Sequence, residues 1–187
     1  HLIPGLEYRC VEKIDLLGLG VTEPAPGPNP AEVARFIQDR RGVAIWAHPF
    51  RRQLPKAEGL AVCLDAVEVW NGRMESHHSP SPERLEVYRV LREKNPELPA
   101  LGGLDLHVAG GFKHLWLEVE GETLSRDVLF QAVREGRFET RGRWFKMRSR
   151  PGYGRAVEMG FQLIQSGLKH FRSVRGKLGG QQEEADV

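Results

Sequence analysis

The feature of this sequence that most constrains its fold is the alternation of short apolar runs with longer helical patterns. The short runs are rich in β-branched and aliphatic residues, which predicts strands, and the longer stretches carry the spacing of amphipathic helices. This rhythm is typical of parallel strands joined by crossover helices, so we expect an α/β fold. The expected strands cover 2–6, 13–19, 43–47, 66–70, 100–104 and 114–119, and the expected helices cover 30–41, 82–94 and 124–135.

Length and composition fit a folded domain. A chain of 187 residues with 40% hydrophobic residues can bury a core without disulfides. Its two cysteines, Cys10 and Cys63, lie in apolar runs and form no C-x-x-C motif, which predicts reduced thiols and a cytoplasmic location. No run approaches the roughly 20 apolar residues that span a bilayer, so we expect no membrane association. Because the chain begins with His1 rather than Met, we expect it to be part of a longer product.

Metal-binding side chains follow several of the expected strands. Glu7 ends the first apolar run, His48 the third, and Asp105 and His107 the fifth. The carboxyl ends of parallel strands meet at one edge, where barrels gather their catalytic groups, so these four residues are expected to converge. Carboxylate and imidazole groups suit divalent ions such as zinc, manganese or iron. Any one of them alone is more often a solvated or hydrogen-bonded residue, and it is their common placement that predicts a metal site.

Further residues are candidates for the same site. Arg51 and Arg52 closely follow the third strand, where they could bind a substrate phosphate in bidentate fashion or form an exposed basic loop. Asp65, Glu68 and Asn71 flank the fourth strand and could orient ligands or substrate, although Glu68 could equally pair with an arginine at the rim of the barrel. Trp46 has the strand parity of the histidine two residues later, so its ring is expected to wall the site.

The order of these motifs resembles the PHP family, named for polymerase-associated and histidinol phosphatase domains. The resemblance covers about residues 1 to 120. It implies a distorted, seven-stranded TIM-like β/α barrel with a two- or three-metal centre that hydrolyses phosphoesters. It also implies that Glu7 bridges two metals, that His48 completes one coordination shell, and that Asp105 and His107 close the site. The matching pieces are Pro4-Gly5-Leu6-Glu7, Leu16-Leu17-Gly18, Ala47-His48-Pro49, Ala66-Val67-Glu68-Val69-Trp70-Asn71 and Gly103-Leu104-Asp105-Leu106-His107.

The sequence departs from the family pattern in three places. The opening His-x-His and Asp-His motifs of the family would precede position 1, so we expect a partial barrel, one to three ions in the complete protein, and fewer ions in this chain. Asp15 stands where family members commonly have His. It could bind a metal, favouring manganese, iron or magnesium over zinc, or be a solvated strand residue. Leu104 replaces the usual small residue before the aspartate.

The last part of the chain differs in character. We expect a barrel segment over 1–140 and a basic extension over 141–187, with a helix at about 155–174. That helix would bury an apolar seam against the barrel or against a second copy of the chain, as a homo-oligomer. The stretch 141–155 mixes cations with aromatic residues as single-strand nucleic-acid binders do, but a net charge of only +2 favours a solvated basic face. The seam consists of Val157, Phe161, Ile164, Leu168 and Phe171.

Two functions therefore compete. The first is a metal-dependent phosphoesterase with an active site that is incomplete in this chain, acting on a small-molecule or nucleotide phosphoester. The second is a non-catalytic binding or scaffold module with the same fold, which the absent motifs and Asp15 favour. A nucleic-acid contact through the basic stretch is the weaker addition to either. The substrate is not readable from the sequence, because the loops that grip it vary.

Overall fold

The computed structural model describes residues 2–57, 59–74, 78–108, 114–120, 123, 125–154, 156–157, 159–164 and 166–167. Contacts between Cα atoms divide the chain into two compact units, His1–Gly152 and Tyr153–Val187. The boundary expected after residue 140 falls inside a strand of the first unit. All candidate site residues belong to the first unit.

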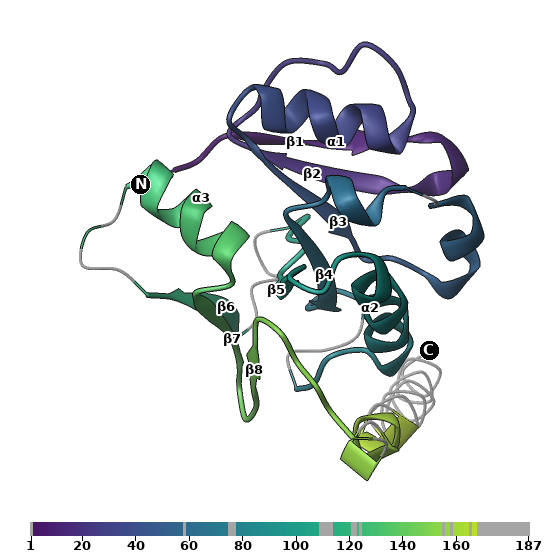
Figure 1. Ribbon diagram of the computed structural model, residues 1–187. Coiled ribbons are helices and arrows are strands. Elements are labelled where there is room, and N and C mark those ends of the chain that lie inside the picture. Colours follow the sequence, from purple (N-terminus) through teal and green to yellow (C-terminus); the bar gives the residue numbers. More distant parts are fainter. Residues whose placement is uncertain are drawn as a thin grey trace, which may run out of the picture. The chain divides into compact units, whose positions relative to one another are not determined.

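The first unit is built on a mixed sheet of five strands (Figure 1). β1 pairs with β2 and β2 with β3 in antiparallel fashion, whereas β3, β4 and β5 are parallel. The α/β class is therefore confirmed, but the expectation of parallel strands is wrong for the first two. One physical reason is the short link 10–14, because a parallel neighbour needs a crossover of a dozen or more residues. In spatial order the strands are β1 (Gly5–Arg9), β2 (Asp15–Leu19), β3 (Val43–Ala47), β4 (Ala66–Asn71) and β5 (Ala100–Gly103).

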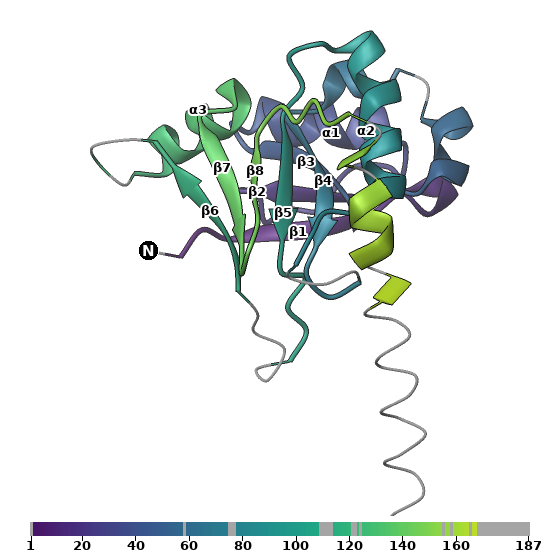
Figure 2. The same cartoon turned by 90° about the horizontal axis from the view of Figure 1, so that it is seen from below.

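A second, antiparallel sheet of three strands lies next to β5 (Figure 2). It consists of β6 (Leu115–Val119), β7 (Phe138–Gly142) and β8 (Lys146–Arg148). The amide of Ala100 donates to the carbonyl of Ser149, and that of Gly102 donates to the Thr140 hydroxyl, which joins the two sheets. Over the described residues the strands form these two open sheets and no closed barrel. The expected strands did not include β7 and β8, although Phe138 and Thr140 are buried and alternate with charged residues.

Three helices follow the local signals in the sequence. The Asn29 side chain caps the first of them, accepting from the amides of Ala31 and Glu32. Ser81 and Ser125 cap the other two in the same way. The bounds agree with the expected ones to within two residues, and they are α1 (Pro30–Asp39), α2 (Pro82–Lys94) and α3 (Arg126–Glu135).

The sheet separates two apolar faces. Val43 and Ile45 of β3 pack in one cluster with Phe130 of α3. On the other face, a Cβ atom on Gly18 would lie 3.1 Å from Ile37 of α1. Leu16 shares the Gly18 face and is paired with Trp46, so the Trp46 ring also lies on the α1 face, where it is fully buried. The expectation that Trp46 walls the site is therefore wrong.

The second unit is described only in part. Its described residues between 156 and 167 are helical. Phe161 is 5% exposed and meets the ring of Tyr153 edge-on at 5.4 Å. Val157 and Ile164 are about half exposed, so among the described seam residues only Phe161 is buried. Leu168 and Phe171 lie outside the described residues, and the role of the seam in a homo-oligomer stays a prediction.

Both cysteines are buried and free, as expected for reduced thiols. Burial raises the pKa of Cys10 to about 11, so its thiol is protonated near neutral pH. Over the part of the chain that the structure describes, no helix combines the length and the apolar character needed to cross a membrane.

Candidate metal centre

The pairing register places two carboxylates on one face of the sheet. Glu7 is the third residue of β1 and faces Leu17, while Asp15 opens β2 between Arg9 and Ala47. Directly paired residues share a side, so Glu7 and Asp15 point to the same face. Glu7 thus lies within its strand rather than at its end. Asp15 reaches the same edge because the start of an antiparallel strand lies beside the carboxyl ends of its neighbours.

His48 comes to this edge through an unusual backbone conformation. It follows β3 directly and has φ of 33°, in the left-handed region that costs a non-glycine residue about 1–2 kcal/mol. Its amide donates to Oε2 of Glu68 in β4 at 2.9 Å. Because the chain leaves the extended conformation here, the alternation of sides along β3 does not continue to His48. This is why strand parity failed to place Trp46.

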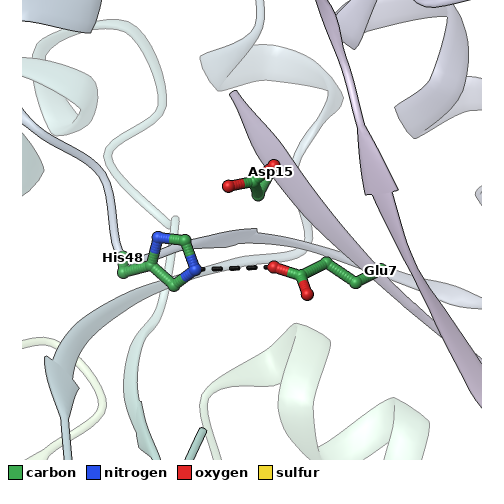
Figure 3. A group of neighbouring side chains, drawn as sticks. All are labelled: Glu7, Asp15 and His48. Atoms are coloured by element: carbon green, nitrogen blue, oxygen red, sulfur yellow. Dashed lines mark ion pairs between the residues drawn. The ribbon is translucent and has the colours of Figure 1, made fainter. Parts of the chain in front are cut away.

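Glu7, Asp15 and His48 form a compact group (Figure 3). His48 Nε2 lies 3.5 Å from Glu7 Oε1, and one ligand atom from each of the three residues lies within 4.8 Å of the others. The side chains of Asp15 and His48 are only 11% and 15% exposed, and that of Glu7 is 45% exposed. Two carboxylates and an imidazole, all reachable from a shared cleft, are a donor set that fits a hard or borderline divalent cation.

Asp105 and His107 form a separate pair. Nε2 of His107 lies 2.7 Å from Oδ1 of Asp105, and Asp105 has φ of 49°. Oδ2 of Asp105 accepts from the Asn71 amide at 3.3 Å and lies 3.7 Å from the guanidinium of Arg73. The group of three potential ligands found among the described residues does not include this pair. The pair is nevertheless part of the same cleft.

One cleft of about 500 Å³ contains all five expected ligands. Their convergence follows from the fold, whereas their binding of metal remains a prediction. The cleft also holds cations and neutral residues that surround the carboxylates. Its lining consists of Glu7, Arg9, Lys13, Asp15, His48, Phe50, Arg52, Gln53, Arg73, Met74, Asp105 and His107.

The two expected phosphate-binding arginines separate. Arg52 lines the cleft, with its guanidinium 4.6 Å from the centre of the Phe50 ring. Arg51 instead pairs with Glu86 of α2 at 3.3 Å, and it is not among the residues that line the cleft. Of the two, only Arg52 is placed to meet a substrate in the cleft.

Asn71 is fully buried. Its amide nitrogen donates to Glu68 and Asp105, and its side-chain oxygen accepts from the amides of Arg73 and Met74. These contacts suit a residue that positions Asp105 better than one that touches substrate.

Three cations of the cleft were not among the residues expected from the sequence, namely Arg9, Lys13 and Arg73. The guanidinium of Arg9 pairs with Oδ1 of Asp15 at 3.2 Å. Arg9 had a usable signal, because it lies two residues after Glu7 and so shares its side of an extended strand. Lys13 had none, since it belongs to a short 3₁₀ turn, η1 (Val11–Lys13), before β2, whereas the strand was expected to begin at residue 13.

Comparison with known proteins supports the fold but not a function. No family model matches the sequence, and no curated protein does either. A solved structure of a two-domain protein from Bacteroides vulgatus ATCC 8482, which contains a predicted PHP-like metal-dependent phosphoesterase, is similar with a TM-score of 0.54 and 19% identity. The similarity covers 74% of this chain and 44% of that one, so this chain corresponds to less than half of that protein. At this identity the likeness shows a shared α/β fold.

Proposed function

We propose that this chain supplies metal ligands and substrate-binding residues to a metal-dependent phosphoesterase. The observation that carries the proposal is the compact group of Glu7, Asp15 and His48. These residues would hold a divalent cation, and the two carboxylates favour manganese or iron over zinc. Asp105 and His107, which line the same cleft, would add further ligands.

The residues around this group suit an anionic substrate. When bound, a divalent cation withdraws charge from phosphoryl oxygens. Lys13 and Arg52 line the cleft and would bind phosphate oxygens, Arg52 through its planar guanidinium. The Asp105 carboxylate, hydrogen-bonded to the ring of His107, fixes the orientation of that imidazole. The proposed substrate class is a small-molecule or nucleotide phosphoester.

A second candidate is a binding or scaffold module that uses no metal. The observation that favours it is the ion pair between Arg9 and Asp15, which gives a nearly buried carboxylate a cationic partner without any ion. The contact between His48 and Glu7 would then be structural as well. Under this candidate, neighbouring side chains balance the charges of the carboxylates without a metal ion, and the cleft binds an anion through its cations alone.

Because the active site is expected to be incomplete in this chain, hydrolysis of an aryl phosphate is measured on the expected longer product, with added manganese, iron or zinc, and separates the two candidates. We expect turnover that rises with manganese and is abolished by Asp105→Asn, with the fold checked by circular dichroism. Asp39→Asn, a substitution at an exposed aspartate near the end of α1, is the matched control and should leave turnover unchanged. Absence of hydrolysis over a broad panel of phosphate mono- and diesters with all three metals would favour the scaffold candidate.

A further inference from the structure

Glu68 is a buried acid whose position needs an explanation. It lies in the middle of β4 with 3% of its surface exposed, between the fully buried Val67 and Val69. A carboxylate in such surroundings is costly unless other groups compensate its charge. Glu68 is not among the residues that line the cleft, so it is not placed to touch a substrate.

The candidate centre has two halves, the group of Glu7, Asp15 and His48 and the pair of Asp105 and His107. The contacts of Glu68 connect these two halves. Oε2 accepts from the backbone amide of His48 at 2.9 Å and from the side-chain amide of Asn71 at 3.1 Å. The same Asn71 nitrogen donates to Oδ2 of Asp105 at 3.3 Å. A continuous hydrogen-bonded path thus runs from β3 through β4 to the loop after β5.

Both ends of this path are backbone positions that need support. His48 and Asp105 have positive φ values of 33° and 49°, which non-glycine residues rarely adopt. Such conformations persist where surrounding contacts fix them, and they concentrate at functional sites. The bond from the His48 amide to Glu68 fixes one of them directly. The bond from Asn71 holds the side chain of the other.

The neighbouring elements are adapted to the Glu68 carboxylate. A Cβ atom on Gly103 in β5 would lie 2.4 Å from Glu68 Oε1, so a larger residue there would displace the carboxylate. Arg84 of α2 is 2% exposed, and its charge acts on Glu68. Burial lowers the pKa of Arg84 to about 10, which still leaves the guanidinium protonated at neutral pH. Burial raises the pKa of Glu68, while Asn71, His48 and Arg84 oppose that rise.

We propose that Glu68 is a positioning residue that fixes His48 directly and Asp105 through Asn71, so that both halves of the centre engage one metal site. The inference rests on the proposed function for the metal, but the fixed geometry itself is a property of the metal-free protein. This role belongs to a residue within β4 that neither follows the end of a strand nor lines the cleft.

The test compares Glu68→Ala with Glu68→Gln in the whole chain. Glutamine keeps an oxygen that can accept from both amides, whereas alanine removes the acceptor. We expect Glu68→Ala to weaken manganese binding, measured by calorimetry, by about tenfold or more, and Glu68→Gln to restore most of it. Glu93→Gln, at an exposed glutamate of α2, is the matched control and should bind as the wild type does.

A second readout uses no metal. In amide NMR spectra of the metal-free protein, Glu68→Ala should shift the amide resonances of both His48 and Asp105, because they share the path. If Glu68→Ala does not fold, Gly103→Ala serves in its place, since it displaces the carboxylate without removing it. A folded variant of either kind that binds manganese as tightly as the wild type would overturn the inference and leave the proposed function standing.

A different result would contradict the proposed function itself. A wild-type chain that binds no manganese would contradict the metal site, and the NMR arm would then decide the positioning role. Shifts at both His48 and Asp105 would support it, and a shift confined to His48 would overturn it.

Discussion

The two halves of the candidate centre are held in place by different means. Glu7 and Asp15 are fixed by the register of antiparallel strands, and with His48 they form a compact group in which Asp15 and His48 are mostly buried. Asp105 and His107 follow β5 in a loop, and the His107 side chain is 54% exposed. The first half is set by backbone pairing over several residues, and the second by a few side-chain hydrogen bonds. We infer that the first half is preorganised for an ion, and that in the second half Asp105 is held in place through Asn71, whereas the exposed His107 imidazole adjusts when the ion binds.

The largest expected effect comes from removing one imidazole from each half. His48→Ala should weaken manganese binding by at least about tenfold, because it takes a nearly buried donor out of a preorganised group. His107→Ala should weaken it by less than about threefold, because an exposed side chain loses more freedom on binding. Calorimetric titration of both variants measures the difference. Equal losses would mean that the two halves are equally preorganised and would break the comparison.

A smaller effect should follow from freeing each carboxylate of its arginine. Arg9→Ala removes a cation 3.2 Å from Asp15 and should strengthen manganese binding a few-fold, because the ion no longer competes with the guanidinium. Arg73→Ala acts on Asp105 from 3.7 Å and should change the affinity less. Both arginines are more than half exposed, so solvent screening keeps the effects modest. Weaker binding by Arg9→Ala would show that this arginine supports the group rather than competing for it.

The sequence predicted those parts of the site that depend on local signals. β3 and α2 begin and end where expected, because an apolar run and a Ser-Pro helix start define them. Strand-end placement was enough to bring His48 and Asp105 to one edge, since β3, β4 and β5 are parallel. In each case the decisive information lies within a few neighbouring residues.

The remaining parts depend on contacts that local patterns do not encode. The place of Asp15 follows from the direction of β2, which is a matter of strand pairing. The place of His48 relative to Trp46 follows from one positive φ value, and the Glu68 carboxylate accepts from the His48 amide only once β3 and β4 are paired. The Arg51 side chain pairs with Glu86 of α2 and does not line the cleft, which depends on the packing of α2 in the folded unit. The open sheets likewise reflect strand pairing and not strand composition.

The most direct test of the central claim is a crystal structure of the chain grown with manganese, measured at a wavelength where manganese scatters anomalously. We predict an anomalous peak within bonding distance of Glu7, Asp15 and His48, with Arg9 moved away from Asp15. A map without a peak in this cleft, in crystals that contain millimolar manganese and show the Arg9 to Asp15 ion pair intact, would contradict the account.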